Sequence, residues 1–488
     1  MNFQTIIGLE VHAQLATQSK MFCGCSVDYA GDSPNSHVCP VCLGMPGVLP
    51  VINRKAVDLT VMTALALHCK ISQYARFDRK NYPYPDLMKG YQISQNYLPF
   101  GEKGWLAIEV GGQKKRIGIN NVHLEEDTAR LTHQNFGGET FSIVDVNRAG
   151  SPLMEIVGDP DLRSPEEARQ YLMTLRAILQ YIGASTANME EGSFRCDANI
   201  SVLPEGAEKT TPKVEVKNMN SFRSVFRALE FEAERIRKAV IEGTKLIQET
   251  RGWVEEQGKT VSQRSKEYAH DYRYFPEPDL PPVILTSAYI EELRAKLPEL
   301  PETRRDRFMA DLGLSQYDAD LLTVSKAMAE YFETCLKAGS LQNVALKDRA
   351  KTVSNWLLGE FTRLLNATNS EIDKAKIAPE QLGSLVGQVL KGTISGTSAK
   401  EVFEEMFNTG KNADDIIKAK GLSQISDTSE IEAVVAGVIS NNPKPVLDYK
   451  AGKVQVMTFL VGQVMKMTKG RANAKLVNEL MKHKLEEG

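Results

Sequence analysis

The chain has 488 residues, which is too long for one hydrophobic core and predicts about three domains. Its 59 Lys and Arg against 62 Asp and Glu give a net charge of -3, which argues against a uniformly basic nucleic-acid binder. No apolar run reaches the ~18 residues that span a bilayer, and the first residues lack a secretory signal. We therefore expect a cytosolic protein, whose cysteines are more often thiols or metal ligands than disulfides.

The first predicted strand covers residues 6–15 and alternates between an apolar and a polar face. Glu10 and His12 lie on the polar face, about 7 Å apart along the strand. Taken alone, such a pair is more typical of a solvated surface than of a site. Whether Glu10 and His12 belong to a site depends on the polar side chains of the neighbouring strands.

Two close pairs of cysteines follow, separated by thirteen residues: Cys23, Cys25, Cys39 and Cys42. This spacing suits a closed tetrahedral thiolate site for zinc, which would staple a loop without catalysing a reaction. The alternative is four unrelated thiols, and the Gly and Pro residues beside the pairs favour the metal. The sequence therefore predicts a zinc-ribbon-like insertion at residues 23–42.

Residues 77–95, FDRKNYPYPDLMKGYQISQ, interleave basic residues with tyrosines. Bases stack on tyrosine rings while Lys and Arg contact phosphates, so the pattern fits a nucleic-acid or nucleotide contact. A tyrosine-rich surface loop is an equally good interpretation. A hairpin is predicted after this segment, over residues 106–119, turning at Gly111 and Gly112.

Later strands carry further polar faces. NNVHLEED ends in Glu125, Glu126 and Asp127, while PLMEIV places Glu155 inside an apolar run, where a carboxylate is costly unless a cation or donor meets it. FRCDANISV aligns Arg195, Asp197, Asn199 and Ser201 on one face, and KVEVKN aligns Lys213, Glu215 and Lys217.

If these strands share one sheet, their polar faces form a floor of carboxylates and cations. Gathered carboxylates indicate a divalent cation, and adjoining Lys and Arg indicate phosphate. The pattern is that of phosphoryl transfer without a P-loop. GWVEEQGKT resembles a P-loop, but five residues instead of four separate Gly252 from Gly258, so we reject it.

Two helices interrupt this strand-rich region. One begins after Ser164, with Pro165 at its first position, and ends at Gly183; the other begins near Ser221 and stops at Gly243. The proline-rich segment 273–283 cannot continue regular structure and looks like a domain exit. From there on the apolar spacing is helical, and basic residues predominate between 444 and 484, where an RNA contact and a solvated face are equally plausible.

Several long motifs together resemble the B subunits of the glutamyl/aspartyl-tRNA amidotransferase, and they do so from end to end: IGLEVH, CPVCLGMPGVLPVIN, FDRKNYPYPDLMKGYQISQ, NRAGSPLMEIV, MEEGSFRCDANISV, VEVKNMNSF and DYRYFPEPDLPP. The resemblance implies an α+β protein with an antiparallel, cradle-like catalytic domain at residues 1–292. An all-helical domain at 293–405 and a helical, YqeY-like tRNA-binding tail at 406–488 would follow.

The resemblance also implies a three-subunit complex with an amidase-type A subunit and a small C subunit. The B subunit would activate Glu carried by glutamine tRNA, or Asp carried by asparagine tRNA, at the expense of ATP. The A subunit would supply ammonia from glutamine through a tunnel.

On these grounds we assign a magnesium site to Glu10, His12, Glu125 and Glu155, with Glu126 as a further candidate. Imidazole is an unusual ligand for magnesium, so manganese could substitute. We expect phosphate or acceptor-end contacts from Arg79, Lys80, Tyr82, Lys213 and Lys217, and substrate orientation by Asp197 and Asn199. The tRNA contacts expected in the tail are Lys466, Lys469, Arg471 and Lys475.

Two other functions remain open on the sequence alone. One is a tRNA-binding scaffold whose chemistry lies in its partners, which would lose activity on truncation of the tail but not on substitution of a carboxylate. The other is a metal-dependent kinase acting on a small molecule, which would turn over ATP without misacylated tRNA and leaves the basic tail unexplained.

Overall fold

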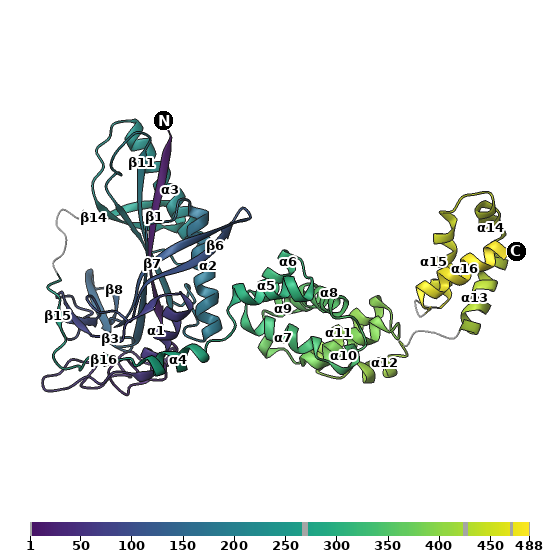
Figure 1. Cartoon of the computed structure of the whole chain (residues 1–488), viewed down its shortest axis with the longest axis horizontal. Coiled ribbons are helices and arrows are strands. Elements are labelled where there is room, and N and C mark those ends of the chain that lie inside the picture. Colours follow the sequence, from purple (N-terminus) through teal and green to yellow (C-terminus); the bar gives the residue numbers. More distant parts are fainter. Residues whose placement is uncertain (1, 266–271, 423–427, 469–471, 488) are drawn as a thin grey trace. The chain divides into compact units, whose positions relative to one another are not determined.

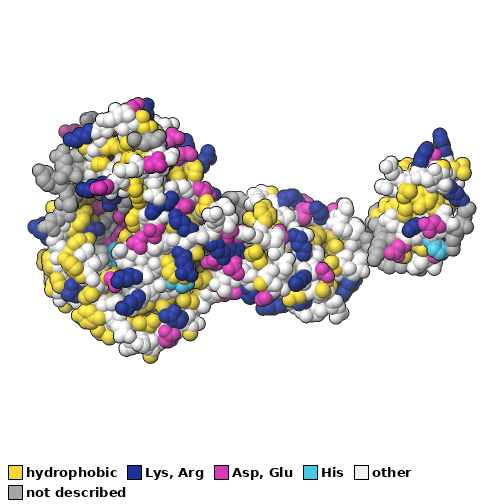
Figure 2. Space-filling model, turned by 45° about the horizontal axis from the view of Figure 1, so that its top comes forward, with side chains coloured by type: hydrophobic (Ala, Val, Ile, Leu, Met, Phe, Trp, Pro, Cys, Tyr) yellow, Lys and Arg dark blue, Asp and Glu magenta, His cyan; other side chains and the backbone are white. Residues whose placement is uncertain are grey.

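The computed structural model describes residues 2–265, 272–422, 428–468 and 472–487 (Figure 1). The chain divides into two compact units, Met1–Leu300 and Pro301–Gly488. Within the described ranges, no helix is both long enough and apolar enough to cross a membrane. Basic and acidic side chains are interspersed over the visible surface, consistent with the small net charge (Figure 2).

A nine-stranded sheet forms the centre of the first unit, and it is antiparallel except between β12 and β13. In spatial order its strands are β14 (Lys259–Ser265), β13 (Glu249–Val254), β12 (Val214–Lys217), β11 (Phe194–Pro204), β1 (Phe3–Gln14), β10 (Pro152–Gly158), β7 (Gln113–Glu126), β6 (Gly101–Val110) and β2 (Lys70–Ile71). The β6–β7 hairpin turns at Gly111 and Gly112, both with positive φ, as predicted.

Smaller sheets flank the main one. They are β15 (Phe275–Pro276) with β4 (Asp78–Asn81) and β5 (Tyr91–Ser94), β16 (Val283–Ile284) with β3 (Tyr74–Ala75), and the hairpin of β8 (Arg130–Phe136) and β9 (Glu139–Asp145). The proline-rich segment predicted as a domain exit thus adds two short strands to the first unit. The 3-10 turn η1 (Glu255–Gln257) joins β13 to β14.

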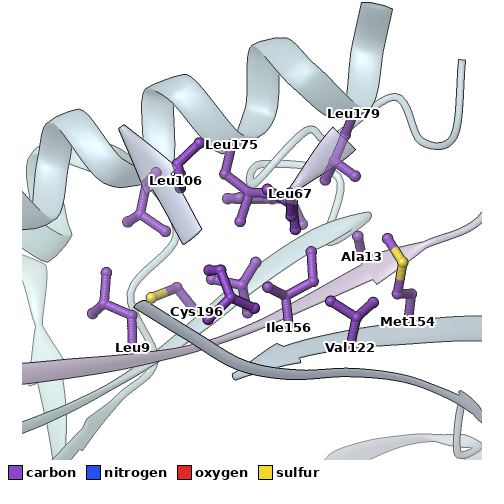
Figure 3. Packing of buried hydrophobic residues seen from close by; sticks show 14 of the residues in the cluster. Leu9, Ala13, Leu67, Leu106, Val122, Met154, Ile156, Leu175, Leu179 and Cys196 are labelled. Carbon is purple, nitrogen blue, oxygen red and sulfur yellow. The ribbon is translucent and has the colours of Figure 1, made fainter. Parts of the chain in front are cut away.

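Helices cover the apolar face of the main sheet. The helices of this unit are α1 (Arg54–Ala66), α2 (Pro165–Ile182), α3 (Phe222–Ile241) and α4 (Ser287–Ala295). Both predicted helix starts are confirmed, since Ser164 and Ser221 cap α2 and α3 through their hydroxyl groups. Leu175 of α2 packs in one buried cluster with Leu9 and Ile156 of the sheet (Figure 3).

The second unit is helical, which confirms the α+β class. Its elements are α5 (Pro301–Leu312), α6 (Gln316–Thr323), α7 (Lys326–Leu336), η2 (Gly339–Leu341), α8 (Leu346–Trp356), the π-helical turn η3 (Leu357–Phe361), α9 (Thr362–Thr368), η4 (Ile372–Lys374), α10 (Pro379–Leu390), α11 (Gly396–Thr409), α12 (Ala413–Lys420), α13 (Thr428–Asn441), α14 (Pro443–Lys450), α15 (Val456–Met467) and α16 (Ala474–Glu487).

This unit contains two hydrophobic clusters, one built from residues 308–417 and one from residues 431–485. Met406 and Ile417 pack in the first of these clusters, with the helices that precede them. Leu293 of α4 packs in the core of the first unit. The boundaries expected at residues 292 and 405 remain predictions.

Candidate metal and substrate site

The sheet register places four polar side chains in one row across the polar face. Arg195 of β11 is paired with His12 of β1, His12 with Glu155 of β10, and Glu155 with His123 of β7. Cross-strand partners project to the same side of a sheet and lie close together. Four segments that are far apart in the sequence therefore contribute to one site.

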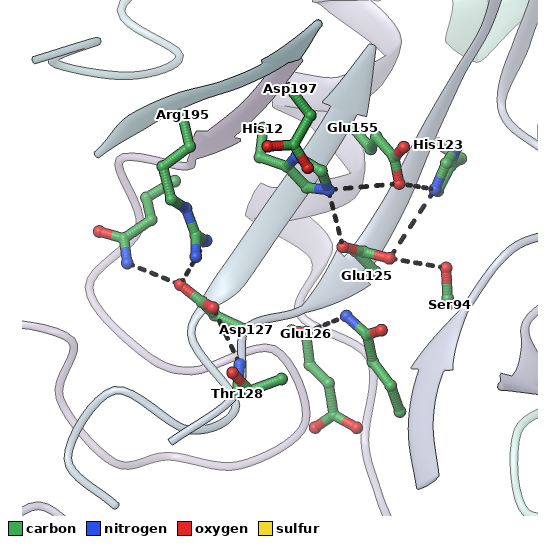
Figure 4. Close-up of polar contacts among 12 residues, drawn as sticks. His12, Ser94, His123, Glu125, Glu126, Asp127, Thr128, Glu155, Arg195 and Asp197 are labelled. Carbon is green, nitrogen blue, oxygen red and sulfur yellow. Dashed lines mark hydrogen bonds and ion pairs between the residues drawn. The ribbon is translucent and has the colours of Figure 1, made fainter. Parts of the chain in front are cut away.

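The closest contacts of this site join two histidines and two glutamates (Figure 4). His12 Nε2 lies 3.4 Å from Glu155 Oε2 and 3.7 Å from Glu125 Oε1, while His123 Nε2 lies 3.0 Å from Glu155 Oε2. One ligand atom from each of His12, Glu125 and Glu155 lies within 4.8 Å of the other two. We call His12, His123, Glu125 and Glu155 the His–Glu cluster.

Charges within the His–Glu cluster stabilise each other. Burial opposes ionisation of Glu155, but His123 and His12 outweigh it and hold the pKa of this carboxyl well below its usual range. Burial likewise opposes a positive charge on His123, yet the glutamates raise its pKa to about 10. Such a set of carboxylate oxygens and imidazole nitrogens fits a divalent cation with mixed ligands.

His123 is a member of the cluster that the sequence interpretation missed. Its Nδ1 lies 2.8 Å from Asn121 Oδ1, an interaction that turns Nε2 toward Glu155. The signal was present, because strict alternation in NNVHLEED puts His123 and Glu125 on one face and Glu126 on the other. The interpretation considered only the three consecutive acidic residues after His123 and so did not include the histidine.

Glu126 points away from the cluster. Figure 4 shows its carboxylate on the other side of the strand from Glu125. It accepts hydrogen bonds from Lys89 Nζ (2.5 Å) and from the backbone N–H of Ile93 (3.0 Å). The structure therefore does not bring this additional metal candidate together with Glu125 and Glu155.

Glu10 lies beside the cluster, one step along β1 from His12. Asn199 Nδ2 donates to Glu10 Oε1 at 2.8 Å, as expected for residues on one polar face. Burial, Glu155 and Asp197 raise the pKa of Glu10. Glu10 is therefore a neighbour of the three closest ligand candidates and is not one of them.

The predicted phosphate contacts separate into two groups. Lys80 is directed toward the cluster, and although burial opposes its charge, Glu125 is among the groups that raise its pKa. Tyr82 and Tyr272 flank its ammonium, with ring centroids at 5.8 and 5.2 Å, and burial raises the pKa of Tyr82 to about 12. Lys80 thus supplies positive charge next to the glutamates.

Arg79 belongs to the other group. Its Nε and Nη2 donate to the two carboxylate oxygens of buried Glu277 at 2.7 and 2.8 Å, and Nη2 also reaches Asp279. These bonds tie the segment after β15 to β4, so Arg79 holds the fold together at this point. The prediction that it contacts substrate has no support in this geometry.

The end of the polar floor carries a lysine–aspartate pair. Lys217 Nζ donates to Asp197 and lies 3.4 Å from Glu215 Oε1. Lys213 is exposed and lies immediately before β12. Its positive charge acts to lower the pKa of Glu10. Lys217, one of the residues predicted to contact phosphate, is therefore paired with Asp197 in this structure.

The four cysteines form a second candidate metal centre. One sulfur atom from each of Cys23, Cys25, Cys39 and Cys42 lies within 4.8 Å of the others. The backbone N–H of Cys39 donates to Cys42 Sγ at 3.1 Å, and a hydrogen bond with the Cys23 thiol lowers the pKa of Cys42. Four converging sulfurs, at least one of them readily ionised, fit a closed zinc site.

The predicted tRNA contacts of the tail are only partly described. Lys466 lies in the last turn of α15. Lys469 and Arg471 fall outside the described residues, and Lys475 is placed by its backbone at the start of α16. The structure therefore leaves these four residues as a prediction.

Comparisons with known proteins agree with the fold class and identify the family. Residues 5–291 match the GatB/GatE catalytic domain, and residues 330–485 match the GatB domain. The B subunit of the aspartyl/glutamyl-tRNA(Asn/Gln) amidotransferase of Dehalococcoides mccartyi (strain CBDB1) is 57% identical over 100% of this chain and 99% of its own length. The corresponding protein of Carboxydothermus hydrogenoformans is 54% identical over 99% of each chain, and that of Thermomicrobium roseum is 52% identical over 100% and 99%.

These matches define a protein of the GatB/GatE catalytic class with a helical tail. The chain belongs to the family of B subunits of aspartyl/glutamyl-tRNA(Asn/Gln) amidotransferases. The family expected from the sequence motifs is confirmed.

Proposed function

We propose that this chain is the subunit of an ATP-dependent amidotransferase that activates the side-chain carboxylate of Glu on tRNA(Gln), of Asp on tRNA(Asn), or of both. The observation that carries the proposal is the convergence of His12, Glu125 and Glu155 on the polar face of the sheet. The substrates are those named for the related amidotransferases.

The chemistry requires activation because a carboxylate is a poor electrophile. Transfer of the terminal phosphoryl group of ATP to the side-chain carboxylate forms an acyl phosphate and ADP. Ammonia then attacks the acyl carbon, a C–N bond forms, the C–O bond to phosphate breaks, and inorganic phosphate leaves. The net result is Gln-tRNA(Gln) or Asn-tRNA(Asn).

We assign the metal of this site to His12, Glu125 and Glu155, with His123 and Glu10 beside them. A bound Mg²⁺ would lower the repulsion between the nucleotide phosphates and the acceptor carboxylate. The imidazole nitrogens are more typical of Mn²⁺ than of Mg²⁺, so manganese is expected to substitute.

Residues of the chain itself supply the remaining functions. Lys80 brings a partly buried positive charge to the edge of the cluster, where it attracts an incoming anion. Asn199 fixes Glu10 by a hydrogen bond, and Asp197 is fixed by Lys217, so both carboxylates are held rigidly for substrate orientation.

Partners and the second metal complete the proposal. An amidase-type A subunit would release ammonia from glutamine, and a small C subunit would complete a cytoplasmic heterotrimer. Zinc held by the four cysteines would have a structural role only, since four thiolates leave no open position. The helical tail would contact the tRNA.

The rival functions are less well supported. A scaffold without chemistry does not need buried carboxylates, yet Glu125 is 2% exposed and lies within the contacts of the cluster. A kinase for a small molecule would leave unexplained the match of residues 330–485 to a second domain of the same family.

The test uses the complex reconstituted with both partner subunits and misacylated tRNA. We expect Glu155→Gln to abolish ATP-dependent formation of Gln-tRNA(Gln) while binding of tRNA is retained. Glu102→Gln is the matched control, because Glu102 is an exposed glutamate on β6 of the same sheet. Full amidation by Glu155→Gln would refute the assignment of the site, and ATP turnover that does not depend on misacylated tRNA would favour the small-molecule kinase.

A further inference from the structure

Arg195 occupies the end of the polar row, next to His12, and none of the assignments above uses it. Its Nη2 donates to Asp127 Oδ2 at 2.8 Å (Figure 4). Its Nε is buried and has no hydrogen-bond partner in the described part of the chain. The side chain as a whole is 37% exposed, so atoms other than the buried Nε are reached by solvent.

Asp127 fixes the position of this guanidinium. The aspartate is 3% exposed, and it also accepts hydrogen bonds from Gln14 Nε2 (3.0 Å) and from the backbone N–H of Thr128 (2.9 Å). Arg148 Nε lies 3.6 Å from the same carboxylate. Asp127 therefore has three partners besides Arg195, although Arg195 is the charge that lowers its pKa most.

The guanidinium fork is suited to carboxylate and phosphate oxygens, which it binds with two parallel hydrogen bonds. Its cross-strand neighbour is His12, so a bound oxyanion would lie beside the metal ligands. The nearby acidic side chain on the same strand, Asp197, is already paired with Lys217.

We propose that Arg195 binds an oxyanion of the reacting substrates through its guanidinium group. This oxyanion is either the side-chain carboxylate of the aminoacyl group or the phosphoryl group transferred to it. The inference rests on the proposed function and adds to it a substrate-binding residue outside the metal shell.

The test compares Arg195→Gln, Arg195→Lys and Arg148→Gln in the complete complex. Loss of one charge-assisted contact predicts a fall in kcat/KM for amidation of roughly ten- to hundredfold in Arg195→Gln. Arg195→Lys keeps the charge without the fork and should recover part of this loss. Arg148→Gln removes the other guanidinium near Asp127 and should stay close to the wild type.

Affinity for a nonhydrolysable ATP analogue identifies the oxyanion. Unchanged affinity in Arg195→Gln supports the aminoacyl carboxylate, and weakened affinity supports the phosphoryl group. Manganese affinity, measured by electron paramagnetic resonance, should be unchanged in either case. An unaffected kcat/KM in Arg195→Gln, or an equal loss in Arg148→Gln, would overturn this inference alone, whereas a wild-type complex that does not amidate would overturn the proposed function as well.

Discussion

His12 and Glu155 are cross-strand neighbours in the β1–β10 ladder, and His12 Nε2 lies 3.4 Å from Glu155 Oε2. The same glutamate is paired in register with His123 on its other side. Glu155 therefore bridges two imidazoles, and the metal ligands assigned above depend on the pairing of three adjacent strands.

His123 is expected to support metal binding. Replacing it with glutamine removes the imidazole nitrogen that lies 3.0 Å from Glu155 Oε2. We expect His123→Gln to weaken Mn²⁺ binding roughly ten- to hundredfold, the usual cost of losing a residue that orients or completes a metal site. Titration with Mn²⁺ followed by electron paramagnetic resonance measures this affinity. His133→Gln, on the exposed β8 strand, is the control, and equal affinities in both variants would contradict the assignment.

The cysteine centre predicts one zinc ion for each chain. Cys42→Ser should lower the zinc content, because a tetrahedral thiolate site tolerates loss of a ligand poorly. It should also lower the melting temperature, since residues 23–42 lose their staple. Elemental analysis of the purified chain measures the zinc, and Cys335→Ala, in the second unit, should leave the zinc content unchanged. The prediction would be refuted if the purified wild-type chain contained no zinc and added zinc did not change its melting temperature.

Arg79 and Glu277 are expected to contribute to stability. Because Glu277 is 2% exposed and accepts two hydrogen bonds from Arg79, Arg79→Ala leaves a buried carboxylate without its cation. Breaking such a pair costs about 3 kcal/mol or more in the free energy of unfolding. Urea denaturation of the chain provides the measurement. Asp279→Ala removes only the more exposed partner and should cost less than ~1 kcal/mol; a similarly small loss in Arg79→Ala would be inconsistent with this role.

Asp127 predicts a pH-dependent contribution to stability. Burial opposes its ionisation, but Arg195 and Arg148 hold its pKa below the ordinary value. A carboxyl group whose pKa is lowered by folding stabilises the folded state above its unfolded pKa of ~3.9, and this contribution is lost as the pH falls through the lower, folded value. We therefore expect the stability difference between the wild type and Asp127→Asn to be constant near neutrality and to shrink below pH ~4. Urea denaturation at several pH values tests this, and a difference that persists unchanged at pH 3 would contradict it.

Local patterns in the sequence predicted much of the first unit. Alternation between apolar and polar residues identified the first strand, and a Ser N-cap followed by proline identified the start of α2, because these signals act over a few residues. The same alternation, applied strictly, would also have separated His123 and Glu125 from Glu126.

Long-range pairings could not be predicted in this way. Arg79 of β4 meets Glu277, which directly follows β15 and is 198 residues away in the sequence, and nothing near either residue indicates the other. The cluster to which Met406 belongs could not be read from the sequence for the same kind of reason. Met406 reads as part of a helix in either domain, and only its packing against the preceding helices assigns it to the cluster of residues 308–417.

The sheet register has a consequence for how this protein can change during evolution. Side chains in a strand alternate between faces, so one amino acid inserted into β10 ahead of Glu155 would turn that carboxylate toward the buried helices and bring an apolar residue to the opposite side. Length changes are therefore expected to be tolerated in the β8–β9 hairpin and other surface connections and excluded from the central strands.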